Sequence, residues 1–189
     1  LVIDAGELPR HEPSTVIDTT ADDPVVLRQG EIKFKGKNEV HSRSEENTQN
    51  IAKELFQKYE IYLGKRPIIF ALIGEMGSGK TQFTKGIARA MGIKEEIISP
   101  TYNLLLDYTL PAIPYTLSHI DAWRFQNPNE LETLGFLKMI EDKNLVMAIE
   151  WADRVMSIIK KYRDHAVVIW VKIEYGKKKN ERLISWNTI

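Results

Sequence analysis

From residue 44 onward, segments with an unbroken run of apolar residues alternate with segments whose apolar residues recur at helical spacing. Two unbroken runs, 68–73 and 145–149, are typical of strands buried on both faces of a parallel sheet. Residues 82–91 follow the first run with a helical pattern, and residues 44–62 precede it with apolar positions three and four residues apart. This alternation predicts a three-layer α/β domain with a mixed, largely parallel sheet.

The rest of the chain continues the same alternation. Residues 117–121 are typical of a further strand, and residues 129–135 of a short helix that ends at a glycine. Residues 154–163 carry apolar side chains at helical spacing, which predicts a helix that covers the sheet. Residues 166–175 and 182–186 flank a turn rich in glycine and lysine, and they predict a closing β-hairpin.

The beginning of the chain has a different pattern. Residues 1–36 hold short strand-like runs separated by turns rich in Pro and Asp, with too little apolar surface to fold alone. Residues 37–43 are polar and charged, and we expect a linker there. We therefore expect an irregular, β-like tail over 1–36, a linker over 37–43 and a folded domain over 44–189. Because the sequence begins with Leu1 rather than Met, we expect its natural start to lie upstream.

A glycine-rich segment joins the first buried run to the helix that follows it. Gly74, Gly79, Lys80 and Thr81 occupy the fixed positions of a phosphate loop, G-x-x-x-x-G-K-[ST]. Glycines let backbone N–H groups turn toward phosphate oxygens, and the helix start adds the positive end of its dipole. Lys80 would supply a full positive charge, and the Thr81 hydroxyl a ligand for Mg²⁺. The residues expected to cradle a nucleotide are Gly74, Glu75, Met76, Gly77, Ser78, Gly79, Lys80 and Thr81.

Two acidic residues stand at the ends of predicted strands. Asp121 closes the run 117–121, and Glu150 follows the apolar run 145–149. In open α/β sheets the ligand binds outside the carboxyl ends of the strands, so both acids would reach the edge that holds the phosphate loop. One carboxylate can hold Mg²⁺ or its waters, and the other can orient or deprotonate the attacking water.

A loop before the next predicted strand offers a further candidate. Pro100 disfavours helix in the residue before it, and the Thr101 hydroxyl either faces the γ-phosphate, as in a switch segment, or belongs to an ordinary loop. His119 lies two residues before Asp121 and therefore on the same strand face. A lone histidine is more often a packing residue, and we leave it out of the chemistry.

Composition narrows the classes of function. The chain has 189 residues, with 26 Lys and Arg against 26 Asp and Glu, so no global charge favours wrapping nucleic acid. The absence of cysteine excludes disulfides, thiolate metal sites and cysteine nucleophiles, and it is consistent with a cytoplasmic protein. No apolar run approaches the roughly 18 residues that a membrane-spanning helix needs, so we expect no membrane partner.

These motifs together resemble the TsaE family, the P-loop ATPases of bacterial tRNA threonylcarbamoyladenosine biosynthesis. The matching segments, in family order, are GEMGSGKTQFTKGIARAMG, SPTYNLLLDY, HIDAWRF, ELETLGF and AIEW. The chain departs from the family pattern in two places. Ala122-Trp123 stands where the family usually has a bulky residue and then Tyr, and the segment 153–163 is longer than usual. Both departures bear on surface contacts more than on ATP binding.

The resemblance implies an activity, cofactors and partners. An Mg²⁺-dependent ATPase of weak intrinsic turnover would act with TsaB and TsaD proteins and meet tRNA only indirectly, in the cytoplasm. The roles that it implies are ATP phosphates on the loop 74–81, Mg²⁺ on Thr81 and Glu150, a candidate base in Asp121, a switch-like loop at Thr101 and a nucleotide contact at Arg182.

A second resemblance covers the beginning of the chain. The segments PSTVID, with Ser14, and VLRQGEI, with Arg28, are similar to the C-terminal end of the YrdC-like L-threonylcarbamoyladenylate synthases. In that family the matching serine and arginine line the threonine and ATP site. The resemblance implies that residues 1–36 are a remnant of a synthase domain joined upstream in cis, without synthase activity of its own.

Two other functions remain open at this point. A small-molecule kinase would use the phosphate loop, an acid after a strand and an acceptor site near residues 129–137, although no arginine-rich lid is evident. A nucleotide-gated binding module would bind ATP without meaningful hydrolysis. The phosphate loop itself does not distinguish ATP from GTP.

Overall fold

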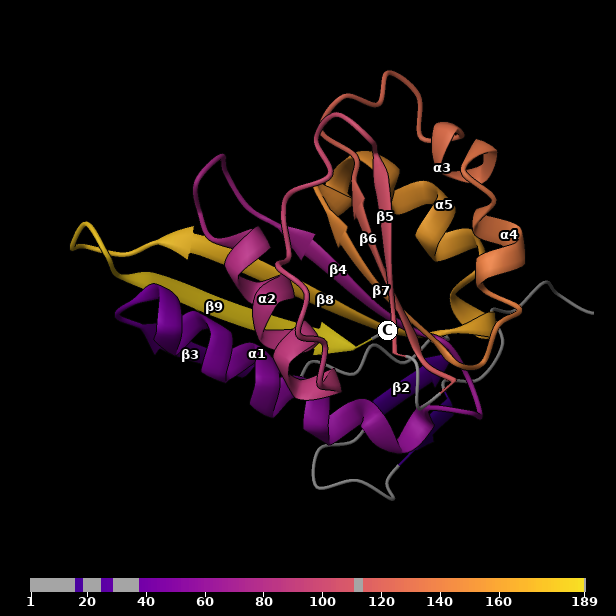
Figure 1. Cartoon of the computed structure of the whole chain (residues 1–189), viewed down its shortest axis with the longest axis horizontal. Coiled ribbons are helices and arrows are strands. Elements are labelled where there is room, and N and C mark those ends of the chain that lie inside the picture. Colours follow the sequence, from indigo (N-terminus) through magenta and orange to yellow (C-terminus); the bar gives the residue numbers. More distant parts are fainter. Residues whose placement is uncertain (1–15, 19–24, 29–37, 111–113, 189) are drawn as a thin grey trace, which may run out of the picture.

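A seven-stranded sheet forms the centre of the computed structural model, which describes residues 16–18, 25–28, 38–110 and 114–188 (Figure 1). The strand order is β3-β9-β8-β4-β7-β6-β5. The strands are β3 (Asn38–Ser42), β4 (Ile68–Ile73), β5 (Leu105–Thr109), β6 (Thr116–Asp121), β7 (Leu145–Glu150), β8 (Val167–Tyr175) and β9 (Arg182–Thr188).

The four middle strands run parallel, and antiparallel strands complete both edges. β4 lies between β8 and β7, and β6 lies on the far side of β7, all in parallel register. β5 pairs antiparallel with β6, while β9 pairs antiparallel with β8. The unbroken apolar runs of β4 and β7 are buried almost throughout, as expected for strands covered on both faces. The predicted mixed α/β fold is confirmed.

Helices cover both faces of the sheet (Figure 1). Alternate residues of β4 point to opposite layers: Phe70 packs with the layer of α1 and α2, and Ile69 packs with the opposite layer. The first layer holds α1 (Glu45–Tyr59), the short η1 (Glu60–Tyr62) and α2 (Lys80–Met91). The second holds α3 (Glu130–Thr133), α4 (Phe136–Met139), η2 (Ala152–Val155) and α5 (Met156–Lys161), with η3 (Arg163–His165) leading into β8.

Helix α1 begins at a side-chain cap. The Ser44 hydroxyl accepts a hydrogen bond from the backbone N–H of Asn47 at 3.0 Å, which satisfies one of the free donors at the helix start. Ile51, Leu55 and Tyr59 are buried on one face, as their spacing predicted. The cap also places Ser44 at the edge of the sheet that carries the phosphate loop.

The predicted linker over 37–43 is wrong for most of its length. Residues Asn38–Ser42 form β3, which pairs antiparallel with β9 and places Val40 opposite Ile184. A segment with one apolar residue gives little local strand signal. Its conformation depends on β9, more than 140 residues later in the chain, whose free edge requires a hydrogen-bonding partner.

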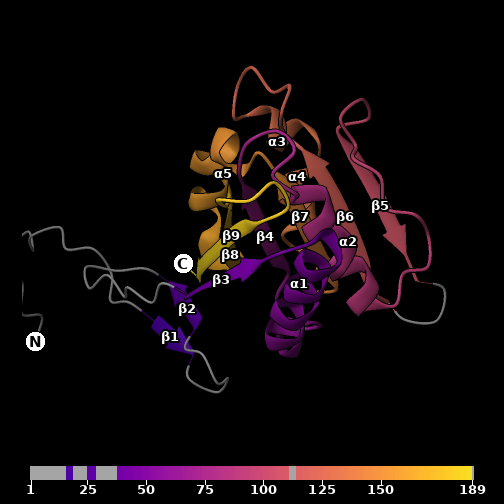
Figure 2. The same cartoon turned by 90° about the vertical axis from the view of Figure 1, so that its left-hand side faces the viewer.

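Only two short segments of the region 1–36 are described. β1 (Val16–Asp18) and β2 (Val25–Arg28) pair antiparallel in a separate two-stranded sheet (Figure 2). Ser14, together with most of the synthase-like segment, lies outside the described residues. Among the helices that the structure describes, none has the length and apolar content that a bilayer crossing requires.

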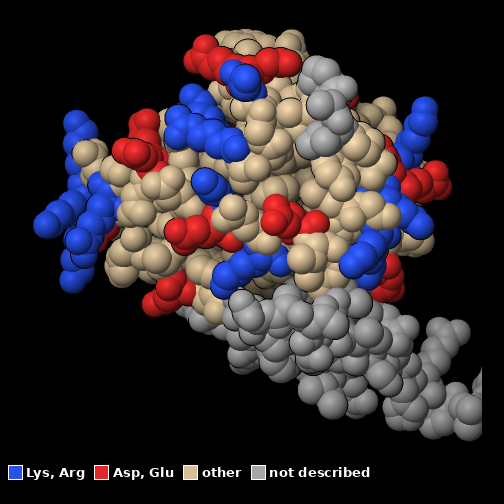
Figure 3. Space-filling model, turned by 60° about the horizontal axis from the view of Figure 1, so that its bottom comes forward, with Lys and Arg blue, Asp and Glu red and all other residues tan. Residues whose placement is uncertain are grey.

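Charged side chains of both signs are interspersed over the face shown in Figure 3. Lys and Arg gather mainly at the left-hand end of that view, where Figure 1 places the turn between β8 and β9. On this face, acidic and basic side chains are therefore mixed, apart from the lysine-rich turn.

Gly86 allows helices α1 and α2 to approach closely. A Cβ at this position would lie 2.2 Å from the Gln49 carbonyl oxygen and 2.7 Å from the Ala52 Cβ. Gly→Ala in a helix usually stabilises by up to about 1 kcal/mol, but here we expect Gly86→Ala to lower the free energy of unfolding by about 1–3 kcal/mol. Denaturant unfolding measures the change, and Arg89→Ala on the exposed face of α2 is the control. Equal or greater stability of Gly86→Ala would contradict the tight contact.

Candidate functional site

The phosphate-loop sequence forms the connection between β4 and α2. Gly77 and Gly79 have φ angles of 72° and 109°, in the left-handed region that favours glycine. Gly74 is required for a different reason: a Cβ there would lie 2.4 Å from the Ile173 carbonyl oxygen and 2.6 Å from the Ser78 hydroxyl. The loop therefore folds tightly against β8, and its backbone leads directly into the start of α2.

The Lys80 ammonium is enclosed by its own loop. Its Nζ donates hydrogen bonds to the carbonyl oxygens of Gly74 at 2.8 Å and Glu75 at 2.9 Å. The same atom lies 3.9 Å from the centre of the Trp151 ring, which forms a cation–π contact. Lys80 is only 4% exposed, and this burial lowers the pKa of its ammonium, with nearby carboxylates opposing the shift.

Glu150 joins the first turn of α2 to the neighbouring strand. The Thr81 hydroxyl donates to Glu150 Oε1 at 2.8 Å, and His119 Nε2 lies 2.9 Å from the same oxygen. His119 is fully buried, and its Nδ1 has no hydrogen-bond partner among the described residues, so Nε2 is the nitrogen that donates to the carboxylate. His119 thus orients Glu150, a function that the sequence analysis missed.

The position of His119 in the sequence already indicated that its side chain needs a polar partner. On β6 it is two residues from Asp121 and on the same strand face, and β6 is paired with β7, which carries Glu150. A polar residue pointing inward beside a predicted acid needs a partner, because an unpaired buried polar group is costly. Only the pairing of β6 with β7 identifies that partner.

Asp121 is the second acid at this edge of the sheet. It lies opposite Glu150 in the register of β6 and β7 and is 3% exposed. Its Oδ2 accepts hydrogen bonds from the Thr101 hydroxyl at 2.8 Å and the Ser99 hydroxyl at 3.2 Å. Its Oδ1 accepts from the Trp123 N–H at 2.9 Å. The two acids and Thr101 are thereby brought together beside the loop that carries Lys80.

Arg182 and Tyr175 brace the phosphate loop from the β8–β9 hairpin. Arg182 donates from Nε to the Ser78 carbonyl at 2.8 Å and from Nη2 to the Gly77 carbonyl at 3.2 Å. The Tyr175 hydroxyl donates to the Met76 carbonyl at 2.6 Å, and the guanidinium of Arg182 stacks 4.4 Å from the Tyr175 ring centre. The predicted site residue Arg182 therefore holds the loop backbone, together with Tyr175, which the sequence analysis did not select.

A cavity of about 450 Å³ opens between the phosphate loop, the start of α1 and the hairpin. Its size is in the range typical of small-molecule and cofactor sites. Its lining consists of Ser44, Glu45, Thr48, Gly77, Ser78, Gly79, Lys80, Thr81, Gln82, Glu150, Asn180 and Arg182.

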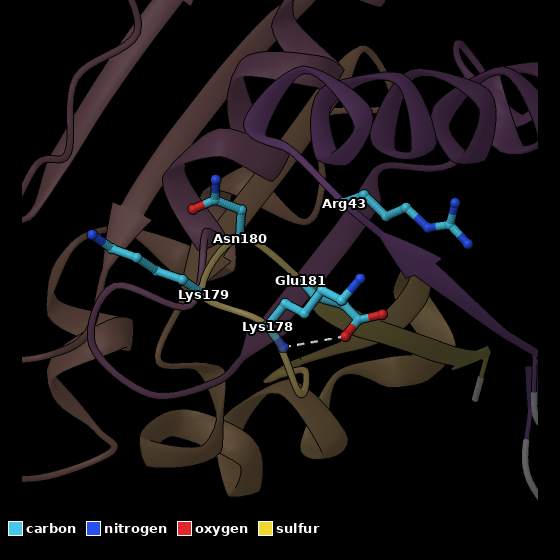
Figure 4. Close-up of a pocket in the computed structure, with 5 residues that line it drawn as sticks. All are labelled: Arg43, Lys178, Lys179, Asn180 and Glu181. Carbon is cyan, nitrogen blue, oxygen red and sulfur yellow. Dashed lines mark hydrogen bonds between the residues drawn. The ribbon is translucent and has the colours of Figure 1, made fainter.

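A second hollow of about 560 Å³ adjoins this cavity and shares Asn180 with it. Figure 4 shows its lining residues on the β8–β9 turn and just after β3, with the backbone N–H of Lys178 donating to the Glu181 carboxylate at 3.3 Å. Arg43 and Lys179 make this hollow basic.

The residues present suit a divalent cation shared with a phosphate group. Thr81 and Glu150 offer the oxygen ligands that Mg²⁺ prefers, and they already lie within hydrogen-bond distance of each other. No cluster of three or more His, Cys, Asp or Glu able to hold a metal occurs in the part of the chain that the structure describes. Mg²⁺ in nucleotide sites is usually held by one or two protein oxygens together with phosphates and water.

A strand, a glycine-rich loop and a helix, with two acids at adjacent strand ends, define a protein of the P-loop class. The family description "Threonylcarbamoyl adenosine biosynthesis protein TsaE" matches residues 42–184, and the chain belongs to this family. The family and fold both indicate nucleotide binding.

Several relatives carry the same name. The chain is 40% identical to the tRNA threonylcarbamoyladenosine biosynthesis protein TsaE of Borreliella burgdorferi over 121 residues, which span 64% of this chain and 82% of that protein. It is 37% identical to the protein of that name from Rickettsia conorii over 117 residues, 61% of this chain and 62% of that protein. A solved structure, described as the crystal structure of Bacillus subtilus YdiB, superposes with a TM-score of 0.60 at 21% identity. It covers 84% of this chain and 89% of the other, and shows the same fold.

The hydrogen bonds from Tyr175 and Arg182 predict that the β8–β9 hairpin holds the phosphate loop in the conformation that binds nucleotide. Tyr175→Phe removes one hydrogen bond to a loop carbonyl, and Arg182→Ala removes two more. We expect each variant to remain folded and to bind nucleotide about 3- to 30-fold more weakly, since a loop that must be ordered on binding loses affinity. Calorimetric titration measures this, and Lys177→Ala on the same hairpin turn is the control. Unchanged affinity in both variants would contradict the bracing role.

Proposed function

We propose that this chain is an Mg²⁺-dependent ATPase that supports threonylcarbamoyl transfer to tRNA adenosine in the cytoplasm. The observation that carries the proposal is that Lys80, Thr81 and Glu150 line one cavity, with Asp121 opposite Glu150 on the neighbouring strand. A phosphate loop with two carboxylates at its edge has the charges and ligands that phosphoryl transfer requires.

Each of these residues has a distinct role in the proposal. Backbone N–H groups of the loop 74–81 bind the β- and γ-phosphates, and Lys80 exchanges its carbonyl partners for phosphate oxygens. Thr81 and Glu150 hold Mg²⁺, which neutralises phosphate charge when it is bound. Asp121 orients or deprotonates the attacking water, and its hydrogen bond with Thr101 ties that acid to the switch-like loop.

The proposed turnover without partners is slow. Arginine fingers raise the rate of phosphoryl transfer by about 10³- to 10⁵-fold in P-loop enzymes. Arg182, the arginine that lines the cavity, is engaged with the loop carbonyls. We therefore propose that TsaB- and TsaD-type partners complete the catalytic arrangement, as the pathway named for the relatives supports.

We further propose that the catalytic domain extends from residue 44 to 189, with β3 added to its sheet. The tail over 1–36 is proposed to be the end of a threonylcarbamoyladenylate synthase-like domain joined in cis. Its described strands β1 and β2 form their own small sheet, which supports a separate origin. A synthase in cis would make the activated carbamoyl donor that the next step of the pathway consumes.

Two variants should distinguish the residues that bind MgATP from those that hydrolyse it. Lys80→Ala removes charge-assisted hydrogen bonds to phosphate, each worth roughly 1.5–3 kcal/mol, so MgATP affinity should fall about 10- to 100-fold. Asp121→Asn keeps the shape of the site, so binding should persist while single-turnover hydrolysis falls about 10²- to 10⁴-fold. Calorimetry and phosphate release measure the two effects. Undiminished hydrolysis by Asp121→Asn would remove this acid from the catalytic set.

Partner dependence gives a further prediction. ATP hydrolysis by the purified chain should be slow and should rise at least about tenfold when the TsaB and TsaD proteins are added together, because they complete the site. Wild-type chain with either protein alone is the control. Equal rates with and without both partners would contradict the proposal, and phosphate transfer to a metabolite instead of water would indicate a kinase.

A further inference from the structure

Two arginines outside the nucleotide cavity are stacked on aromatic rings. The guanidinium carbon of Arg124 lies 4.8 Å from the Tyr102 ring centre, and that of Arg154 lies 4.8 Å from the Trp123 ring centre. Both arginines are exposed, and Tyr102 is 84% exposed. We refer to Tyr102, Trp123, Arg124 and Arg154 as the arginine–aromatic patch.

Among the described residues, no carboxylate pairs with the two arginines of this patch. Across residues 38–110 and 114–188, neither Arg124 nor Arg154 forms an ion pair, and Arg154 donates only to the Phe125 carbonyl, at 3.3 Å. Both side chains border an open hollow of about 680 Å³, whose lining also includes Gln126. Stacking restricts a guanidinium to few orientations while leaving most of its N–H donors free for a carboxylate.

The patch is connected to the nucleotide site through two tryptophans. Lys80 Nζ lies over the Trp151 ring, the Trp151 and Trp123 ring centres are 4.4 Å apart, and Arg154 lies over Trp123. When Lys80 turns toward a phosphate, it leaves the face of Trp151, so the support of Trp123 changes.

A second connection passes through Asp121. This carboxylate accepts from the Trp123 N–H and from the Thr101 hydroxyl, so it holds two of the three segments that carry the patch. Tyr102 directly follows Thr101, and Arg124 directly follows Trp123. A change at this acid during catalysis therefore reaches both arginine–aromatic pairs.

The chemistry of the patch favours a protein partner over RNA. Trp, Tyr and Arg dominate the energetically important positions of protein interfaces, whereas lysine is depleted there, and no lysine lines this hollow. Stacked bases would need free aromatic faces, but arginines already cover one face of Tyr102 and of Trp123. The lysine-rich turn is at the far end of the β8–β9 hairpin, away from the loop that follows β6 (Figure 1).

We propose that the arginine–aromatic patch is the docking surface for a carboxylate-bearing segment of the partner complex, and that nucleotide binding adjusts it through Trp151 and Asp121. This inference rests on the proposed function, because it assigns to this surface the partners that stimulate hydrolysis. It predicts that docking is electrostatic and responds to the nucleotide state of the chain.

Charge reversal tests the patch. Arg124→Glu with Arg154→Glu should weaken binding to an immobilised TsaB–TsaD complex at least about 30-fold in MgATP, since like charges across an interface repel. Lys177→Glu with Lys178→Glu, an equal change of charge on the β8–β9 turn, should weaken binding less than about threefold. Both double variants should bind MgATP as the wild type does. If the charge-reversal variant fails to fold, Arg124→Gln with Arg154→Gln replaces it. This neutral double variant should bind the TsaB–TsaD complex about tenfold more weakly than the wild type.

The outcomes distinguish the patch from the proposed function. If both double variants bind the complex equally, the patch proposal is overturned while partner-stimulated hydrolysis stands. If the patch variant loses tRNA binding but keeps TsaB–TsaD binding, the surface recognises RNA instead. If wild type binds MgATP but not the complex, both the partner assignment and the patch proposal fail, although nucleotide binding remains.

Discussion

The arrangement of the candidate site depends on compensating one buried ammonium group. Lys80 lies at the start of α2 with almost no exposed surface, and an unpaired charge there would be strongly destabilising. Two loop carbonyls, the Trp151 ring and the nearby carboxylates of Glu150 and Asp121 compensate for it. The tight turn at Gly74 and the parallel pairing of β4, β7 and β6 are what bring these groups to one place.

Pairing between distant strands decides which side chains support the loop. The β8–β9 hairpin is close to the carboxy terminus, yet Arg182 and Tyr175 hold three consecutive loop carbonyls, those of Met76, Gly77 and Ser78. These hydrogen bonds fix the orientation of three successive peptide groups of the loop. The hairpin therefore supports the shape of the loop from a distant part of the sequence.

Local motifs predicted where the candidate site residues lie in the fold but not the contacts that support them. The strand, loop and helix around Lys80 follow from adjacent residues, and the strand-end positions of Asp121 and Glu150 follow from two apolar runs. By contrast, the conformation of β3 and the contact of His119 with Glu150 depend on strand pairing between distant segments. Periodicity within one segment contains no information about such a pairing.

The proposed function and the observed structure place opposite demands on the carboxylate of Asp121. As a group that orients water it needs a lone pair facing the γ-phosphate, whereas in this structure its two oxygens accept from Thr101, Ser99 and Trp123. Ser99 and Thr101 belong to one loop and also lie 2.9 Å apart, hydroxyl to hydroxyl, so they can leave Oδ2 together while Trp123 keeps Oδ1 fixed. Freeing Oδ2 for water thus moves the loop that carries Tyr102. Under the proposed function, readiness for hydrolysis and the shape of the exposed surface would therefore be controlled by the same oxygen atom.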